Sequence, residues 1–138
     1  MSYKNVIHQN TLAIAHLYSR IQETLQFRCD GPQQRQAWVN ACAEFHEKYD
    51  QLAFLGGVNT ARDRLRSGES EAIDYALDFL EVRPYFFRSG YLYKDLIRVL
   101  RNCPLSQAQR RRYDEIYQRY LDYRDRRRHS RKVEITLS

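Results

Sequence analysis

The chain has few residues that interrupt helices, and it lacks the short glycine motifs that mark common catalytic sites. It contains only five glycines and three prolines in 138 residues. They stand at a few positions, such as Gly31-Pro32 and Gly56-Gly57, so the long stretches between them can be helical. The G-x-S-x-G, H-E-x-x-H, Walker and dinucleotide glycine patterns are all absent. We therefore expect a protein that is not an enzyme and uses no cofactor or metal.

The three cysteines are too few and too scattered for a disulfide framework. Cys29, Cys42 and Cys103 form no C-x-x-C pair, and their number is odd, which favours a reducing, cytoplasmic setting. Cys42 and His46 lie four residues apart, but two ligands are too few for a metal site. Apolar runs are also short. None approaches the roughly 18 residues of a membrane span.

What the chain does contain is enough apolar material for one core. It is 43% hydrophobic and 13% aromatic, with eleven tyrosines, a composition unlike that of disordered segments. Its length is about that of a single domain. We expect one helical domain over residues 1–130. Residues 133–137 alternate like a strand but have no partner strand, so we expect a flexible or short extended tail over 131–138.

Apolar residues recur with helical spacing in about six segments. Serine or threonine marks the start of three of them: Thr60 with Asp63 and Ser106 with Gln109 resemble capping boxes, and Ser89 is a candidate N-cap. The predicted fold is all-α, a single compact bundle of antiparallel or angled helical pairs. The lengths of the last three segments are also typical of stacked, HEAT-like pairs. The predicted helices cover about 3–28, 32–54, 60–67, 70–82, 90–102 and 106–128.

The segment at 70–82 is predicted to be the central helix. Apolar side chains cover most of its circumference, which is typical of a helix buried by neighbours on several sides. Four acidic residues form the remaining line: Glu71, Asp74, Asp78 and Glu81. This line has no histidine and no matching carboxylates on a second helix, as a di-metal site needs. We interpret it as a solvated face or as an internal partner for arginines.

A turn with consecutive aromatic residues follows that helix and is the first candidate site. Its notable residues are Arg83, Tyr85, Phe86, Phe87, Arg88 and Tyr91. Tyrosine, phenylalanine and arginine are the residues that anchor protein interfaces, so the turn could be a recognition surface. The alternative is structural: one of the phenylalanines fills the gap between two helices and fixes their angle. A structural role is the more common one for such a turn.

The positive charge is confined to the C-terminal part of the chain, which is the second candidate site. The formal charge is +6. Residues 1–97 hold 11 basic and 12 acidic side chains, whereas residues 98–138 hold 12 basic and 5 acidic. Arginines with interleaved tyrosines are able to bind phosphates and stack bases. The candidate residues for nucleic-acid binding are Arg124, Arg126, Arg127, Arg128, Arg131 and Lys132.

The structural alternative for this basic segment is a solvated helix face with no binding role. Asp122 and Arg126 are four residues apart, the spacing of an exposed ion pair, and aspartates at 114, 122 and 125 would repel phosphate. The leading hypothesis is therefore a non-enzymatic protein-interaction module, such as an adaptor, a regulator or an immunity-type inhibitor. Its partner would be another protein. The alternative is nucleic-acid binding through the basic C-terminal segment.

Overall fold

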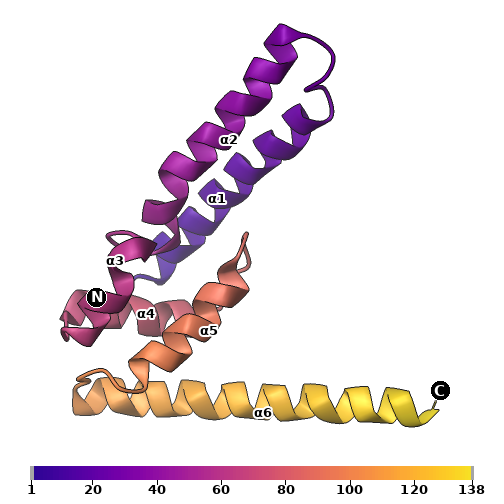
Figure 1. Ribbon diagram of the computed structural model, residues 1–138. Coiled ribbons are helices and arrows are strands. Elements are labelled where there is room, and N and C mark those ends of the chain that lie inside the picture. Colours follow the sequence, from indigo (N-terminus) through magenta and orange to yellow (C-terminus); the bar gives the residue numbers. More distant parts are fainter. Residues whose placement is uncertain (1, 138) are drawn as a thin grey trace.

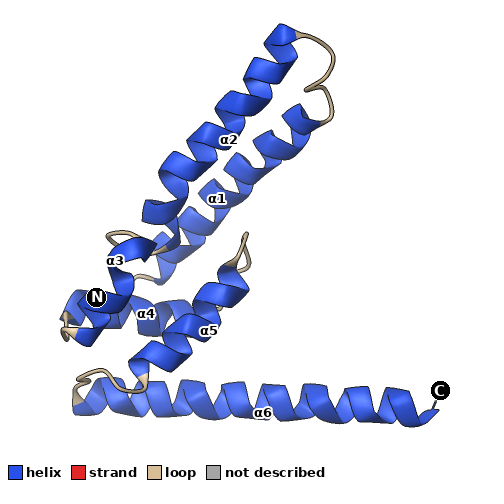
Figure 2. Cartoon of the chain, viewed as in Figure 1, coloured by secondary structure: helices blue, strands red, loops and turns tan. Residues whose placement is uncertain are grey.

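The computed structural model describes residues 2–137, with side-chain surroundings for residues 2–132. These residues form an all-α fold of six helices and no strand (Figures 1 and 2). The central helix has the predicted bounds, and the others differ from prediction by a few residues except at the C-terminal end. No helix of the described part has the length and apolarity needed to cross a membrane. The helices are α1 Lys4–Leu25, α2 Pro32–Ala53, α3 Val58–Arg66, α4 Ser70–Val82, α5 Ser89–Leu100 and α6 Gln107–Leu137.

The helices form a long hairpin that stands on a base of shorter helices. α1 and α2 run antiparallel along their whole length, and α3, α4 and α5 gather at one end of this pair (Figure 1). α6 crosses under the base and continues past it towards the C-terminus (Figure 1). Gly31-Pro32 separates the two hairpin helices, with Pro32 in the first turn of α2, where its missing N–H costs no helical hydrogen bond.

α4 is the centre of the core, as its apolar pattern predicts. Seven of its apolar residues are buried, from Ala72 to Leu80. The ring of Tyr75 lies 4.8 Å from that of Phe54 and 5.5 Å from that of Tyr3, so the start of the chain packs on the same helix. α6 covers α4 with Tyr113 and Ile116, which are both buried. Burial on several sides explains why so few polar positions remain on α4.

The helix starts match the prediction only where capping is local. Ser106 and Gln109 form the predicted capping box: each accepts a hydrogen bond from the other's backbone N–H, at 3.1 and 2.9 Å. The prediction for Thr60 is wrong, because α3 begins at Val58 and Asp50 of α2 accepts the N–H of Asn59. A capping group from another helix leaves no signal in the local sequence.

Two further predictions are corrected at α5 and at the C-terminal end. Ser89 is the first residue of α5 rather than its N-cap, and its hydroxyl accepts the N–H of Phe86 inside the turn. Residues 131–137 continue α6 in place of the extended tail. A strand without a partner leaves its backbone groups unpaired, whereas a helix pairs them within the segment. This explains why the alternating pattern does not decide the conformation.

The acidic line of α4 divides between the two interpretations: Asp78 and Glu81 are partners for basic residues, Asp74 accepts a hydrogen bond from Gln109, and Glu71 is exposed. Asp78 is only 4% exposed. Its carboxylate accepts the backbone N–H of Tyr3 at 2.7 Å and a guanidinium N–H of Arg112 at 2.8 Å. Glu81 pairs with Arg112 and with Lys4, the latter at 3.2 Å. One cluster therefore joins the start of α1, the centre of α4 and the first turns of α6.

Removing the charge of Asp78 should weaken this junction strongly. Asp78→Asn leaves a buried group that no longer matches Arg112, and such losses typically cost about 3 kcal/mol. We expect the free energy of unfolding in urea to fall by about that amount. The control is Asp95→Asn, because Asp95 pairs with Arg62 at the surface, where a pair contributes less than about 1 kcal/mol. Equal losses in the two variants would contradict a central role for Asp78.

The same cluster predicts a dependence of stability on pH. Burial tends to raise the pKa of Glu81, but hydrogen bonds from Arg112 and Lys4 outweigh it and lower this pKa below its ordinary value of 4.5. A carboxyl with a lowered folded pKa stabilises the fold above the unfolded pKa and loses that contribution as pH falls through the folded pKa. At neutral pH, we expect the native chain to have a higher free energy of unfolding in urea than the Glu81→Gln variant. This difference should shrink below pH 4.5, and a constant difference would be inconsistent with the cluster.

Candidate binding groove

The aromatic turn is partly core and partly surface, so both interpretations of it hold for different residues. Phe86 is 8% exposed and packs between Phe79 and Tyr49. Phe87 stacks on Tyr18 of α1, with ring centres 5.3 Å apart. Tyr85 and Tyr91 point away from the core and are 93% and 78% exposed. The turn is thus anchored by two phenylalanines and presents two tyrosines.

Two arginines in this turn occupy backbone conformations that favour glycine. Arg83 has φ 50° and Arg88 has φ 64°, and they are the two non-glycine residues with positive φ in the described chain. A side chain in this left-handed region costs about 1 kcal/mol relative to glycine. Neither arginine pairs with the acidic line; both stack on aromatic rings. Such unfavoured conformations cluster at functional sites.

The turn and the C-terminal helix, separate in the sequence, line one groove. This groove has a volume of about 1190 Å³ and lies between α1, the turn, the start of α5 and the distal half of α6. All six candidate residues of the turn line it. So do three of the six basic candidates of α6: Arg124, Arg127 and Arg131. The other three, Arg126, Arg128 and Lys132, are exposed and are not among its lining residues.

The groove is basic and aromatic, and none of its described lining residues is acidic. Its cations are Arg83, Arg88, Lys94, Arg124, Arg127 and Arg131, and no ion pair joins any of them to a carboxylate of the described chain. Beside them lie the rings of Tyr18, Tyr85, Phe86, Phe87, Tyr91, Tyr93, Tyr120 and Tyr123. The groove is therefore positively charged, and no carboxylate of the described chain neutralises its cations by an ion pair.

The aspartates of α6 do not face this groove. With 100° per residue, Asp122 lies roughly 170° and Asp125 roughly 130° round the helix from the mean direction of Arg124, Arg127 and Arg131. Nor does Asp122 pair with Arg126; it accepts a hydrogen bond from Gln118 instead. The helical geometry thus removes the objection that these aspartates would repel phosphate from the groove arginines. The expected solvated face is present, because Asp122, Asp125 and Arg126 are exposed, but its expected ion pair is not formed.

Arg83 connects the two walls of the groove. Its guanidinium carbon lies 4.8 Å from the ring centre of Tyr93 in α5 and 4.5 Å from that of Tyr123 in α6. Tyr93 also approaches Tyr120, with ring centres 6.1 Å apart. Burial raises the pKa of Tyr93, an effect that the Arg83 charge opposes. Tyr93 therefore stays neutral over the physiological pH range and can stack on the cation.

Sequence reasoning missed several residues of the groove. Tyr18 and Tyr93 belong to the apolar stripes of their helices, which assigned them to the core, and Lys94 is a single cation on α5. Tyr120 is half-buried on α6. The only usable signal was the tyrosine content of these stripes, because tyrosine tends to sit where a core meets water.

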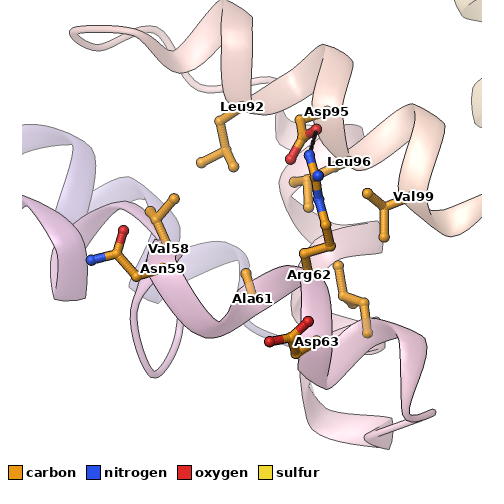
Figure 3. A pocket seen from close by; sticks show the side chains of 10 residues that line it. Val58, Asn59, Ala61, Arg62, Asp63, Leu92, Asp95, Leu96 and Val99 are labelled. Carbon is orange, nitrogen blue, oxygen red and sulfur yellow. Dashed lines mark hydrogen bonds and ion pairs between the residues drawn. The ribbon is translucent and has the colours of Figure 1, made fainter.

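A second, smaller hollow lies between α3 and α5 and contains none of the predicted site residues. Its volume is about 340 Å³. Figure 3 shows its apolar floor, which includes Leu92 and Leu96, and the ion pair between Arg62 and Asp95 that bridges it. The ion pair joins two of its four polar or charged lining residues, and the other two are Asn59 and Asp63. No cluster of potential metal ligands occurs in the part of the chain that the structure describes.

Comparison with known proteins finds no protein similar to this chain. No protein-family model matches this chain, and no curated protein or solved structure matches it either. The HEAT-like stacking of the last helices therefore stays a prediction. The groove is therefore the feature of this protein that points to a function.

Proposed function

We propose that this protein is a binding protein, not an enzyme, and that it binds single-stranded nucleic acid in the groove between the 83–91 turn and α6. The observation that carries the proposal is that exposed tyrosine rings lie in the same groove as cations that form no ion pair with a carboxylate of the described chain. Proteins that bind single strands combine a positive groove, which follows the phosphates, with aromatic rings on which bases stack.

The arrangement assigns a role to each wall. Arg124, Arg127 and Arg131 form one line along α6 and contact successive phosphates. Tyr85 and Tyr91 offer ring faces that bases can reach only when they are unstacked, which favours a single strand over a duplex. The volume of about 1190 Å³ lies above the roughly 300–1,000 Å³ of small-molecule sites. A polymer therefore suits the groove better than a metabolite.

An acidic segment of a partner protein is the competing occupant. It would meet the same cations, and tyrosine, phenylalanine and arginine are common interface anchors. The composition of the groove suits either occupant, because arginine and aromatic residues are enriched at protein interfaces too, and five of its six cations are arginines. A polyanion with regularly spaced charges and flat bases accounts for both the arginines and the exposed rings. The experiments below distinguish the two occupants.

Binding should depend on salt and on the groove arginines. The probe is a labelled oligothymidylate of about 15 nucleotides, and the readout is fluorescence anisotropy. If four phosphates are neutralised, the affinity falls about 50-fold between about 50 and about 200 mM salt. Replacing Arg124 and Arg127 by Gln should weaken binding by at least about tenfold and reduce the salt slope by about 1.4.

The matched control replaces Arg126 and Arg128 by Gln, since these arginines lie on the same helix but outside the groove. It removes the same charge but no lining residue of the groove, so it should weaken binding less than the Arg124 and Arg127 replacements and leave the salt slope nearly unchanged. Undetectable binding at low salt, or equal losses in the two double variants, would refute the proposal. If polyglutamate of equal length displaces the oligonucleotide at equal residue concentration, the groove is instead a site for acidic protein segments.

The exposed tyrosines should contribute to binding but not to stability. Tyr85→Ala removes a ring that is 93% exposed, so the free energy of unfolding should change by less than about 0.5 kcal/mol. The same variant should lower affinity for the oligonucleotide by about tenfold, because one stacked base contributes about 1–3 kcal/mol. Phe27→Ala removes an exposed ring outside the groove and should leave affinity unchanged. If Tyr85→Ala lowers the free energy of unfolding but binds the oligonucleotide with native affinity, this assignment is wrong.

A further inference from the structure

The distal half of α6 has little packing to hold it in place. From Asp122 to Lys132 every side chain is exposed, and Figure 1 shows this part of α6 extending past the other helices. We call residues 122–132 the arm. The arm carries three groove arginines, Arg124, Arg127 and Arg131. Its direction therefore decides whether these cations face the tyrosines of the turn.

Arg83 lies where the arm begins. Its guanidinium fills the space between Tyr93 of α5 and Tyr123, the second residue of the arm. Because Arg83 also ends α4, this contact ties the arm to α4, to α5 and to the aromatic turn at one point. A planar cation between two rings is a stronger and more directional tether than a single exposed contact.

The backbone of Arg83 indicates that its side chain matters. The residue caps α4 in the left-handed conformation, with φ 50°. Glycine is the usual residue there and avoids the steric cost. An arginine at this position is costly for the backbone, so the contacts of its side chain must offset that cost locally. The stacking between Tyr93 and Tyr123 is the contact that does so.

We propose that Arg83 is a positioning residue that holds the arm in line with the turn, so that one strand can contact the groove arginines and the tyrosines together. This inference rests on the proposed function. Arg83 contributes to binding by positioning the arm, in addition to any contact that it makes with a phosphate. Its removal should therefore uncouple the arm arginines from binding and leave cations on other elements as effective as before.

A double-mutant cycle tests this coupling with the same oligothymidylate probe. Arg83→Gly suits the backbone and should reduce affinity about tenfold. Arg127→Gln should cost about fivefold in the native background but less than about twofold once Arg83 is glycine. Lys94→Gln is the matched control, because Lys94 lines the groove from α5; its cost should be the same in both backgrounds. Additive costs for Arg83 and Arg127 would overturn the positioning role.

Hydrogen exchange gives a readout that needs no nucleic acid. In Arg83→Gly the backbone amides of residues 122–132 should exchange faster than in the native chain, while those of α4 keep their protection. Arg88→Gly, at the other left-handed position of the turn, should leave the arm unchanged. Unaltered exchange of the arm in Arg83→Gly would also overturn the proposal. If the native protein binds no oligonucleotide, the proposed function fails, and faster exchange would still identify Arg83 as the residue that holds the arm.

Discussion

The carboxylate of Asp78 is the group on which the arrangement of the domain depends. It is buried in α4, where it accepts hydrogen bonds from the backbone of Tyr3 and from Arg112. A buried charge that loses its partner is strongly destabilising, so the start of α1 and the first turns of α6 cannot leave α4 separately. Arg112 lies at the docked end of α6, where Tyr113 and Ile116 are also buried. The rest of the helix continues past the aromatic turn and lines the groove.

The turn adds a second constraint, which is the division of its aromatic residues between core and surface. Phe86 and Phe87 pack against Phe79, Tyr49 and Tyr18, and the hydroxyl of Tyr49 donates to the carbonyl of Phe87 at 2.7 Å. This anchoring leaves the remaining rings of the turn on the outside. The same few residues therefore stabilise the fold and shape the groove. Stability and binding are separable only at its exposed positions.

Local features were predictable from the sequence, whereas contacts between distant residues were not. The central helix, its acidic line and the capping box of Ser106 with Gln109 follow from spacing within a few residues. Thr60 was misassigned because Asp50 of α2 caps α3. Ser89 is displaced by one position, because α5 begins at this residue and its hydroxyl accepts the N–H of Phe86 within the turn. Hydrogen-bond partners from another helix follow from packing, which no local pattern encodes.

The residue types of the site can be recognised in the chain alone: a turn rich in aromatic residues and arginine, and a basic last helix. Composition and periodicity reveal them without any knowledge of packing. The packing of the helices brings these two segments to one groove and points Phe86 inward and Tyr85 outward. It also turned Asp122 and Asp125 away from that groove. The facing of a helix is set by what it packs against. α6 contacts α4 through the hydrogen bond from Arg112 to Asp78 and contacts Arg83 at the end of α4 through Tyr123, and no local pattern encodes these contacts.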